Sequence, residues 1–207
     1  MENDVKEFLS ELLKQLKSID YIKPEDIPNI DLYMDQVTTF MDEQLAASKR
    51  YESDKILTKT MINNYAKNNL LPSPDKKKYS KEHVLTLLFI YYFKNILSIN
   101  DIRSILNPLT EKYFGNDDGF TMQDVYTEVF SLEAEESQKL LKDLGKKYKI
   151  AGETFEDFPD EDQKFLHTFS FICMLSFDVY IKKMLIERMI DNLNCLLYTS
   201  PSPRDCS

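Results

Sequence analysis

Apolar residues recur at three- and four-residue steps along most of the chain, and this spacing predicts a mainly α-helical fold. Residues 1–20 predict an amphipathic helix, and a second helix is expected from Leu32 to about Ala47, with Asp31 as its cap. The run 81–97 is apolar nearly all round, which is typical of a helix buried on most sides. This run is therefore the expected core.

The stretch 58–80 predicts a short helix, a turn and a basic β-hairpin loop, or wing, just before the apolar run. Thr58 can cap the helix, and Asn69 stands where it must end, since asparagine tolerates the left-handed conformation. The prolines that follow exclude further helix. Residues 75–78 would form the tip of the wing, with Tyr79 on the returning strand.

The second half of the chain predicts two further helical stretches. Residues 115–119 read as a turn and a domain boundary, after which Thr121 can cap a helical pattern that continues to Gly152. A last, long helix is expected over 160–193. It leaves two arrangements open, namely pairing with a second copy of the chain and packing against the helix that begins near Thr121.

The last residues of the chain resemble a synthetic sequence and not a natural protein segment. Residues 195–205 resemble the translated end sequence of a common sequencing-library adapter, so the tail 195–207 is expected to be non-native. Of the three cysteines, Cys173 then remains, and its apolar surroundings predict a buried, reduced thiol. The expected organisation is an N-terminal helix (1–23), a head (24–114), an acidic helical region (115–194) and this tail (195–207).

Composition fits a globular protein with a core, because 43% of the 207 residues are hydrophobic and 29% are charged. The low number of glycines, four, favours a mainly helical fold. The start of the chain lacks the basic-then-apolar pattern of an export signal. The longest uncharged apolar stretch, 165–177, is shorter than the roughly 20 residues of a membrane span. A cytoplasmic protein without a membrane segment is the expectation.

Charge is distributed unevenly along a chain whose net charge is −9. Residues 55–82 hold seven lysines and two carboxylates, a net charge of +5, whereas residues 116–162 hold fourteen carboxylates and five lysines, a net charge of −9. Charges are screened within about 10 Å at moderate salt, so a basic face of an acidic protein can still bind phosphate. The alternative is that these lysines only keep a surface loop in water.

The polar side of the predicted short helix carries residue types that read DNA. Asparagine can form two hydrogen bonds with adenine in the major groove, and lysine can reach guanine or phosphate. The expected contacts to double-stranded DNA are Lys59, Asn63, Asn64, Lys67 and Asn68 on the helix, and Lys76, Lys77 and Lys78 on the wing.

The same stretch resembles the DNA-binding head of MerR-type regulators, which read roughly T-L-R-Y-Y-E-x-x-G-L-L-x-P, then basic residues and a tyrosine. The matching positions are Ile62, Tyr65, Leu70, Leu71, Pro72 and Tyr79, followed by Ser80 as a helix cap. The departures are Asn63, Asn64, Ala66 and Asn69, where the family has Arg, Tyr, Glu and Gly. Residues 27–106 more closely resemble an uncharacterised bacterial family catalogued as domain of unknown function 1836. The MerR resemblance implies a winged helix-turn-helix, transcription regulation, and pairing through the C-terminal helix. The DUF1836 resemblance implies a helix-turn-helix without a known activity.

Catalytic side chains are scarce, since the chain has two histidines, no glycine-rich phosphate loop and no zinc-binding motif. We therefore expect neither an enzyme nor a bound cofactor or metal. The first hypothesis is a DNA-binding transcriptional regulator. The second is a protein-interaction module with a helix-turn-helix fold that does not bind DNA. The first requires Lys59, Lys67 and the wing lysines to form one exposed face, and carboxylates interrupting that face would favour the second.

Overall fold

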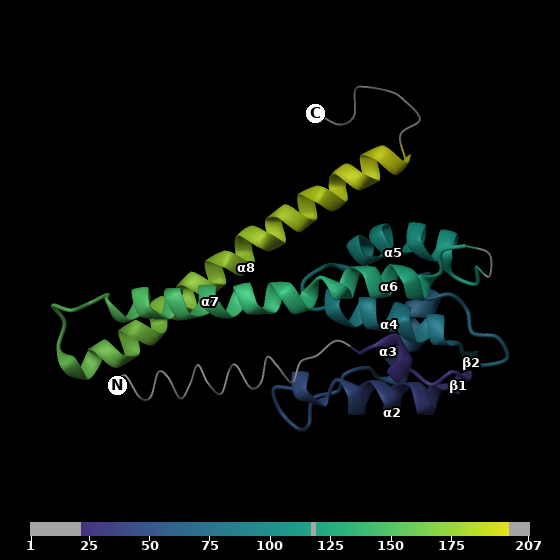
Figure 1. Ribbon diagram of the computed structural model, residues 1–207, viewed down its shortest axis with the longest axis horizontal. Helices are drawn as coiled ribbons and strands as arrows, with labels where there is room; N and C mark the ends of the chain where they lie inside the picture. Colours follow the sequence, from purple (N-terminus) through teal and green to yellow (C-terminus); the bar gives the residue numbers. More distant parts are fainter. Residues whose placement is uncertain (1–21, 117–118, 199–207) are drawn as a thin grey trace. The chain divides into compact units, whose positions relative to one another are not determined.

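The computed structural model describes residues 22–116 and 119–198, and Figure 1 shows their course. The helix expected over 1–20 and most of the adapter-like tail lie outside the described residues. Contacts divide the described residues into two compact units: residues up to Ser131 together with 190–198, here called the head unit, and residues 132–189, here called the hairpin unit. The division falls at Ser131, beyond the turn at 115–119 where the sequence predicted it.

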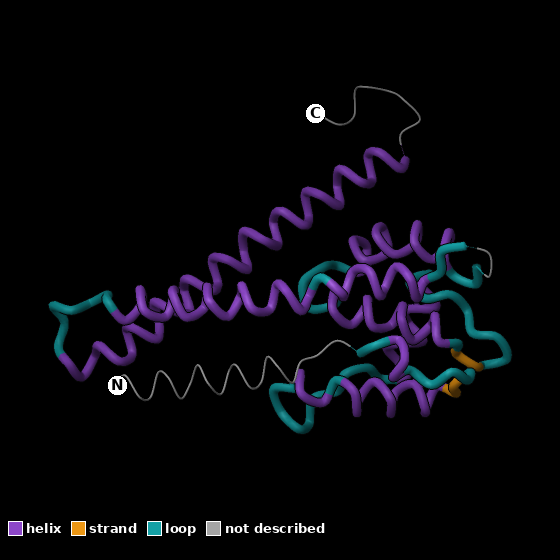
Figure 2. Tube along the Cα trace, in the orientation of Figure 1, coloured by secondary structure: helices purple, strands orange, loops and turns teal. Residues whose placement is uncertain are grey.

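The head unit is mainly helical, as predicted, with two very short strands, and Figure 2 separates the two kinds of element by colour. Its described elements are η1 (Pro24–Asp26), β1 (Leu32–Tyr33), α2 (Met34–Gln44), η2 (Ala46–Ser48), α3 (Lys59–Lys67), β2 (Lys78–Tyr79), α4 (Lys81–Phe93), α5 (Ile99–Tyr113) and α6 (Met122–Ser131).

Helix α4 forms the centre of the head unit, because nearly every side chain along it is apolar. Its residues from His83 to Tyr91 are all buried. Helices α5 and α6 and strand β2 pack against it, and the ring of Phe89 lies 5.5 Å from that of Tyr126 on α6 (Figure 1). The prediction that residues 81–97 form the core is confirmed, although the helix ends at Phe93.

Strand β1 replaces what the sequence predicted as the first turn of a helix. Leu32 and Tyr33 pair with Tyr79 and Lys78 of β2 in an antiparallel register, so α2 begins only at Met34 and ends at Gln44. The backbone N–H of Tyr33 donates to Oε1 of Gln36 at 2.8 Å, which starts α2 at that point. The predicted helix over 32–47 was therefore too long at both ends, and the returning strand of the wing is attached to the start of α2.

Helix α3 ends as the sequence predicted. Asn69 has a φ angle of +56°, in the left-handed region. The N–H of Leu70 donates to the carbonyl of Tyr65 at 2.9 Å, and the N–H of Asn69 to that of Ala66 at 3.2 Å. These two bonds make a Schellman motif, which satisfies carbonyls that a helix end otherwise leaves free. Leu70 is then buried and anchors the end of α3 in the core.

The helices after α4 differ in part from the sequence pattern. Helix α5 continues through Pro108, although a proline removes one backbone hydrogen bond inside a helix. The pattern predicted as one stretch from Thr121 to Gly152 is two helices, α6 and α7 (Glu133–Gly152). The predicted cap of α6 is confirmed, because Thr121 Oγ1 accepts from the N–H of Asp124 at 3.2 Å.

The hairpin unit consists of α7 and most of α8 (Asp160–Tyr198), which begins directly after Pro159, as predicted. Cys173 lies on this helix and is exposed, so the prediction of a buried thiol was wrong. The apolar run around it does not face a core on all sides, since many of its large side chains are exposed. Among the described residues, no helix combines the length and the apolar character needed to cross a membrane.

Candidate nucleic-acid interface

Helix α3 presents a continuous polar side to solvent. Thr58 caps the helix, its Oγ1 accepting from the N–H of Met61 at 3.2 Å. Ile62 and Tyr65 are buried against the core, so the opposite side must face outward. The exposed residues of this side, here called the α3 face, are Lys59, Thr60, Asn63, Asn64, Lys67 and Asn68. The predicted helix contacts thus share one side, and Thr60, which was not predicted, lies among them.

The side chain of Asn68 bonds to the backbone at the C-terminal end of the α3 face. The side-chain nitrogen Nδ2 of Asn68 donates to the carbonyl of Asn64 at 2.7 Å. The amide N–H₂ of Asn68 is therefore partly occupied by the helix end, whereas Asn63 and Asn64 point outward from the middle of the helix. This arrangement makes Asn63 and Asn64 better candidates than Asn68 for reading a base edge.

Arg103 on α5 reaches the same end of α3. Its Nε donates to the carbonyl of Asn68 at 2.9 Å, and its Nη1 contacts Oδ1 of Asn100 at 3.4 Å. This places a guanidinium at the negative end of the α3 dipole, where a cation is favoured. Arg103 was not among the predicted contacts, because a partner 35 residues away in the sequence leaves no local pattern.

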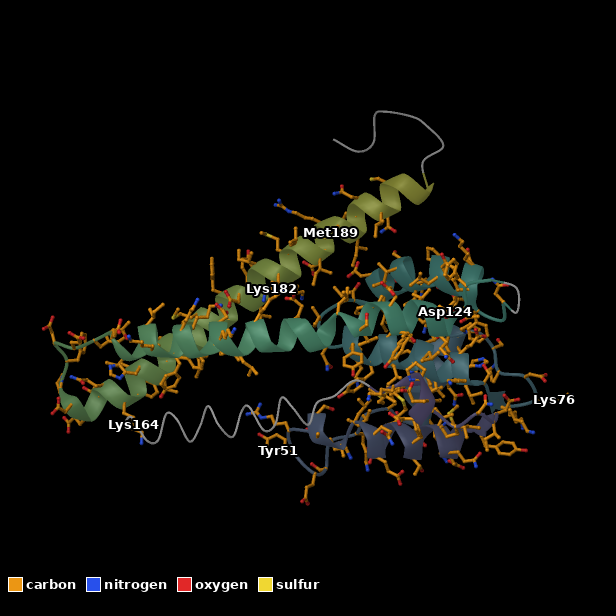
Figure 3. The ribbon with its side chains drawn as sticks, in the orientation of Figure 1. Tyr51, Lys76, Asp124, Lys164, Lys182 and Met189 are labelled. Atoms are coloured by element: carbon orange, nitrogen blue, oxygen red, sulfur yellow. The ribbon has the colours of Figure 1, made fainter. Side chains whose placement is uncertain are left out.

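The wing turn exposes two of its three lysines. Lys76 and Lys77 have φ angles of +46° and +65°, and the turn is closed by the N–H of Lys78, which donates to the carbonyl of Asp75 at 2.8 Å. Figure 3 labels Lys76 at the outer end of this loop. Lys78 is half-buried instead, with Nζ 5.6 Å from the centre of the Tyr33 ring. The wing therefore offers Lys76 and Lys77 to a ligand more freely than Lys78.

One carboxylate meets the α3 face directly. Lys59 forms an ion pair with Asp35 in the first turn of α2, and both side chains are largely exposed. Exposed ion pairs contribute only about 0–1 kcal/mol, so a phosphate can compete for the lysine. The basic face is thus exposed, as the first hypothesis requires, but Asp35 interrupts it at one end.

The buried side chain of His83 packs against Tyr79, where the wing ends. The Nδ1 atom of His83 accepts from the backbone N–H of Ser80 at 3.0 Å, which caps α4, and its ring packs edge-on against Tyr79 and Phe114. Burial lowers the pKa of His83, while the backbone carbonyls of Ser73 and Pro72 and the charge of Asp31 oppose this shift. His83 therefore favours the neutral form, in which Nδ1 remains free to accept.

Among the described residues, no cluster of side chains fits a metal site. No group of three His, Cys, Asp or Glu side chains there is close enough to hold a metal ion. The candidate site is accordingly built from amides and cations, the groups that hydrogen-bond base edges and neutralise phosphates.

Comparison with known proteins assigns the head unit to a family. The model of the family described as "Domain of unknown function (DUF1836)" matches residues 22–129, which is 108 of 207 residues and includes α3, the wing and α4. No curated protein and no solved structure matches the chain. Because the family match covers just over half of the sequence, this protein belongs to the DUF1836 family.

Proposed function

We propose that this protein binds double-stranded DNA and regulates transcription, with α3 in the major groove and the wing on the phosphate backbone. The observation that carries the proposal is the α3 face, a row of exposed amides and lysines on a helix whose other side is buried. A major groove about 12 Å wide admits one α-helix, and asparagine and lysine are side chains that read bases there. The head would then be a MerR-like winged helix-turn-helix of a bacterial regulator.

Each part of the candidate site has a separate role in this proposal. Asn63 and Asn64 would contact base edges, since their side chains are exposed at the middle of α3. Lys67 would reach guanine or phosphate, and Lys76 and Lys77 would neutralise phosphates. Those wing lysines carry no base specificity, and they fix the position of α3 along the duplex. A protein with this role acts where the DNA is, so we assign it to the cytoplasm.

A second candidate function is a protein-interaction module that keeps this fold without binding DNA. The ion pair between Lys59 and Asp35 favours it, because that carboxylate neutralises one of the cations on the α3 face. The contact of Lys78 with the Tyr33 ring makes another lysine less available to phosphate. The two functions differ in whether the remaining lysines bind phosphate, which the salt dependence of binding measures.

The test compares two double substitutions of equal charge. Lys76→Gln with Lys77→Gln removes the exposed wing cations, and Lys142→Gln with Lys146→Gln removes two exposed lysines from α7 in the hairpin unit. Binding to a labelled duplex is measured by fluorescence anisotropy over a range of salt concentrations. Each lost phosphate contact should reduce the slope of log K against log salt by about 0.9.

The expected result is that the unmodified chain binds DNA with a steep salt slope. The wing variant should lose about two units of that slope, and the α7 variant should match the unmodified chain. Absence of binding at low salt would contradict the proposal and favour the interaction module. An equal loss in both variants would contradict the assignment of Lys76 and Lys77.

A further inference from the structure

A cavity lies along the outer surface of α6 in the head unit. Met122, Tyr126 and Phe130 are buried on the inner side of this helix, so its other residues face outward. The cavity, here called the α6 cavity, has a volume of about 660 Å³. Helices α5 and α6 pack against each other, and both contribute to it (Figure 1). Its apolar lining residues are Tyr113 on α5, Phe120 in the loop before α6, and Val125 and Val129 on α6.

Phe120 is 75% exposed, although hydrogen bonds hold the backbone around it. Its carbonyl accepts from Nδ2 of Asn116 at 3.2 Å. The N–H of the next residue, Thr121, donates to Oδ2 of Asp124 at 2.8 Å, and Oγ1 of Thr121 donates to the same oxygen at 2.7 Å. The fold therefore keeps an aromatic ring in water at the edge of the α6 cavity.

The exposed apolar surface at the α6 cavity is typical of a contact site. At 150–250 Å² per aromatic side chain, Phe120 alone exposes on the order of 150 Å². Val129 is 50% exposed and lines the same cavity, and Tyr113 and Val125 are half-buried there. Apolar surface that surrounds a hollow and has a polar rim usually marks a place where another molecule binds.

The polar rim of the α6 cavity is negatively charged. Asp124 and Glu128 are exposed on α6 and line the cavity, and Figure 3 labels Asp124. Hydrogen bonds from Thr121 lower the pKa of Asp124, so its carboxylate is charged at neutral pH. Residues 120–138 include no lysine or arginine. The cation of Lys112 lies at the α5 end, with Nζ 5.1 Å from the centre of the Tyr113 ring.

This charge restricts the class of molecule that can cover the cavity. Carboxylates repel nucleic acid and anionic membrane surfaces at short range. Residues 1–21 of the chain, which lie outside the described residues, hold five carboxylates and three lysines, so their net charge also has the wrong sign. A ligand small enough to enter the cavity would leave most of Phe120 in water. The observations favour a protein segment with both apolar and basic side chains.

We propose that the α6 cavity is a docking site for a basic amphipathic helix of a partner protein. Apolar side chains on one side of that helix pack between Phe120 and Val129, and its lysine or arginine side chains meet Asp124 and Glu128. Recognition of a helix in a groove uses apolar anchors at three- and four-residue steps. Helix α6 has 10 residues and is about 15 Å long, so the contact spans roughly three turns of the partner helix.

The proposed docking site is independent of the proposed DNA contacts. It lies on α6 and at the end of α5, and it includes no residue of the α3 face or the wing. Binding of a peptide can therefore be measured without DNA, and its failure would leave the DNA-binding proposal unchanged.

The first experiment measures binding of a fluorescent helical peptide to the full chain by anisotropy. The peptide consists of leucine and lysine, is about 14 residues or roughly four turns long, and has its leucines on one side of the helix. One control peptide has glutamate in place of lysine. The other has the same composition with leucine and lysine alternating, which spreads the leucines around a helix. The amphipathic basic peptide should bind at micromolar concentration, and both controls should bind about tenfold more weakly or less.

The second experiment locates the binding site with matched variants. Phe120→Ser should weaken peptide binding about tenfold or more, because aromatic side chains at the centre of an interface contribute most of the affinity. Its control is Phe165→Ser on α8, since Phe165 is 70% exposed and lies outside the α6 cavity. Glu128→Lys should weaken binding and reduce its salt dependence, and Glu156→Lys, at another exposed carboxylate, should do neither. Circular dichroism checks that each variant is folded.

Four results would overturn the proposal. They are equal binding of the acidic peptide, equal effects of Phe120→Ser and Phe165→Ser, equal effects of Glu128→Lys and Glu156→Lys, and binding of benzyltrimethylammonium at the cavity more tightly than the peptide. The last result would assign the cavity to a small organic cation. Light scattering without peptide adds a further check, because a dimer mass that Phe120→Ser reduces to that of one chain would assign the surface to a second copy instead.

Discussion

Asn69 illustrates how much a single residue contributes to the site, because it ends α3 in the left-handed conformation with φ of +56°. Its side chain is exposed, so substitutions there report mainly on backbone strain. Asn69→Gly should leave the free energy of unfolding almost unchanged, since glycine adopts this angle freely. Asn69→Val should lower it by about 1–2 kcal/mol, the cost of a left-handed angle for a residue with a branched side chain.

Urea denaturation of the two variants measures this difference, and the glycine variant is the control for loss of the asparagine side chain. Equal destabilisation by Gly and Val would show that the side chain, and not the backbone angle, matters at this position.

Individual side chains also show where sequence reasoning ended. The outward direction of Asn63, Asn64 and Lys67 followed from the buried positions of Ile62 and Tyr65 on the same helix. The partners of Lys59 and Lys78 did not, because Asp35 and Tyr33 belong to a segment far away in the sequence. Helical spacing fixes the side from which a residue points, and it carries no information about what the fold brings to meet it.

At the scale of elements, local signals predicted α3, the wing and α4 well. A cap, a left-handed asparagine, prolines and an all-apolar run each act within a few residues, so each is legible in the sequence. Strand β1 was missed because two residues are too few to show a period, and its partner β2 is separated from it by α2 and α3. The break at Leu132 between α6 and α7 was missed because apolar spacing continues across it.

The start of α4 should depend on pH through His83. Burial lowers its pKa in the folded chain, so below about pH 6.5 the unfolded chain binds a proton that the folded chain does not. Stability from this group is therefore fully present above that pH, and it is lost as the pH falls toward the lowered pKa of the folded state. Protonation would also remove Nδ1 as the acceptor for the N–H of Ser80.

The variant His83→Gln tests this dependence, because glutamine at the third position of a helix can still accept from the capping residue but does not titrate. Chemical denaturation at about pH 7.5 and about pH 5.5 should show a smaller loss of stability for His83→Gln than for the unmodified chain. An equal loss in both chains would exclude His83 as the cause.

At the scale of the whole molecule, the two units differ in charge. The α3 face and the wing belong to the head unit, where residues 55–82 carry a net charge of +5. Residues 132–162 of the hairpin unit hold ten carboxylates and five lysines, a net charge of −5. DNA phosphate attracts the first region and repels the second, so charge alone restricts which part of the chain approaches a duplex.

The most direct test of the central claim is a selection of random-sequence DNA duplexes by the full chain. The account predicts that bound duplexes share a sequence, and that the double variant Asn63→Ala with Asn64→Ala loses this enrichment. Each lost asparagine–adenine pair should cost about 1–3 kcal/mol, while weak, salt-sensitive binding through the lysines remains. The account is contradicted if the unmodified chain enriches no sequence over the input, or if the variant enriches the same one.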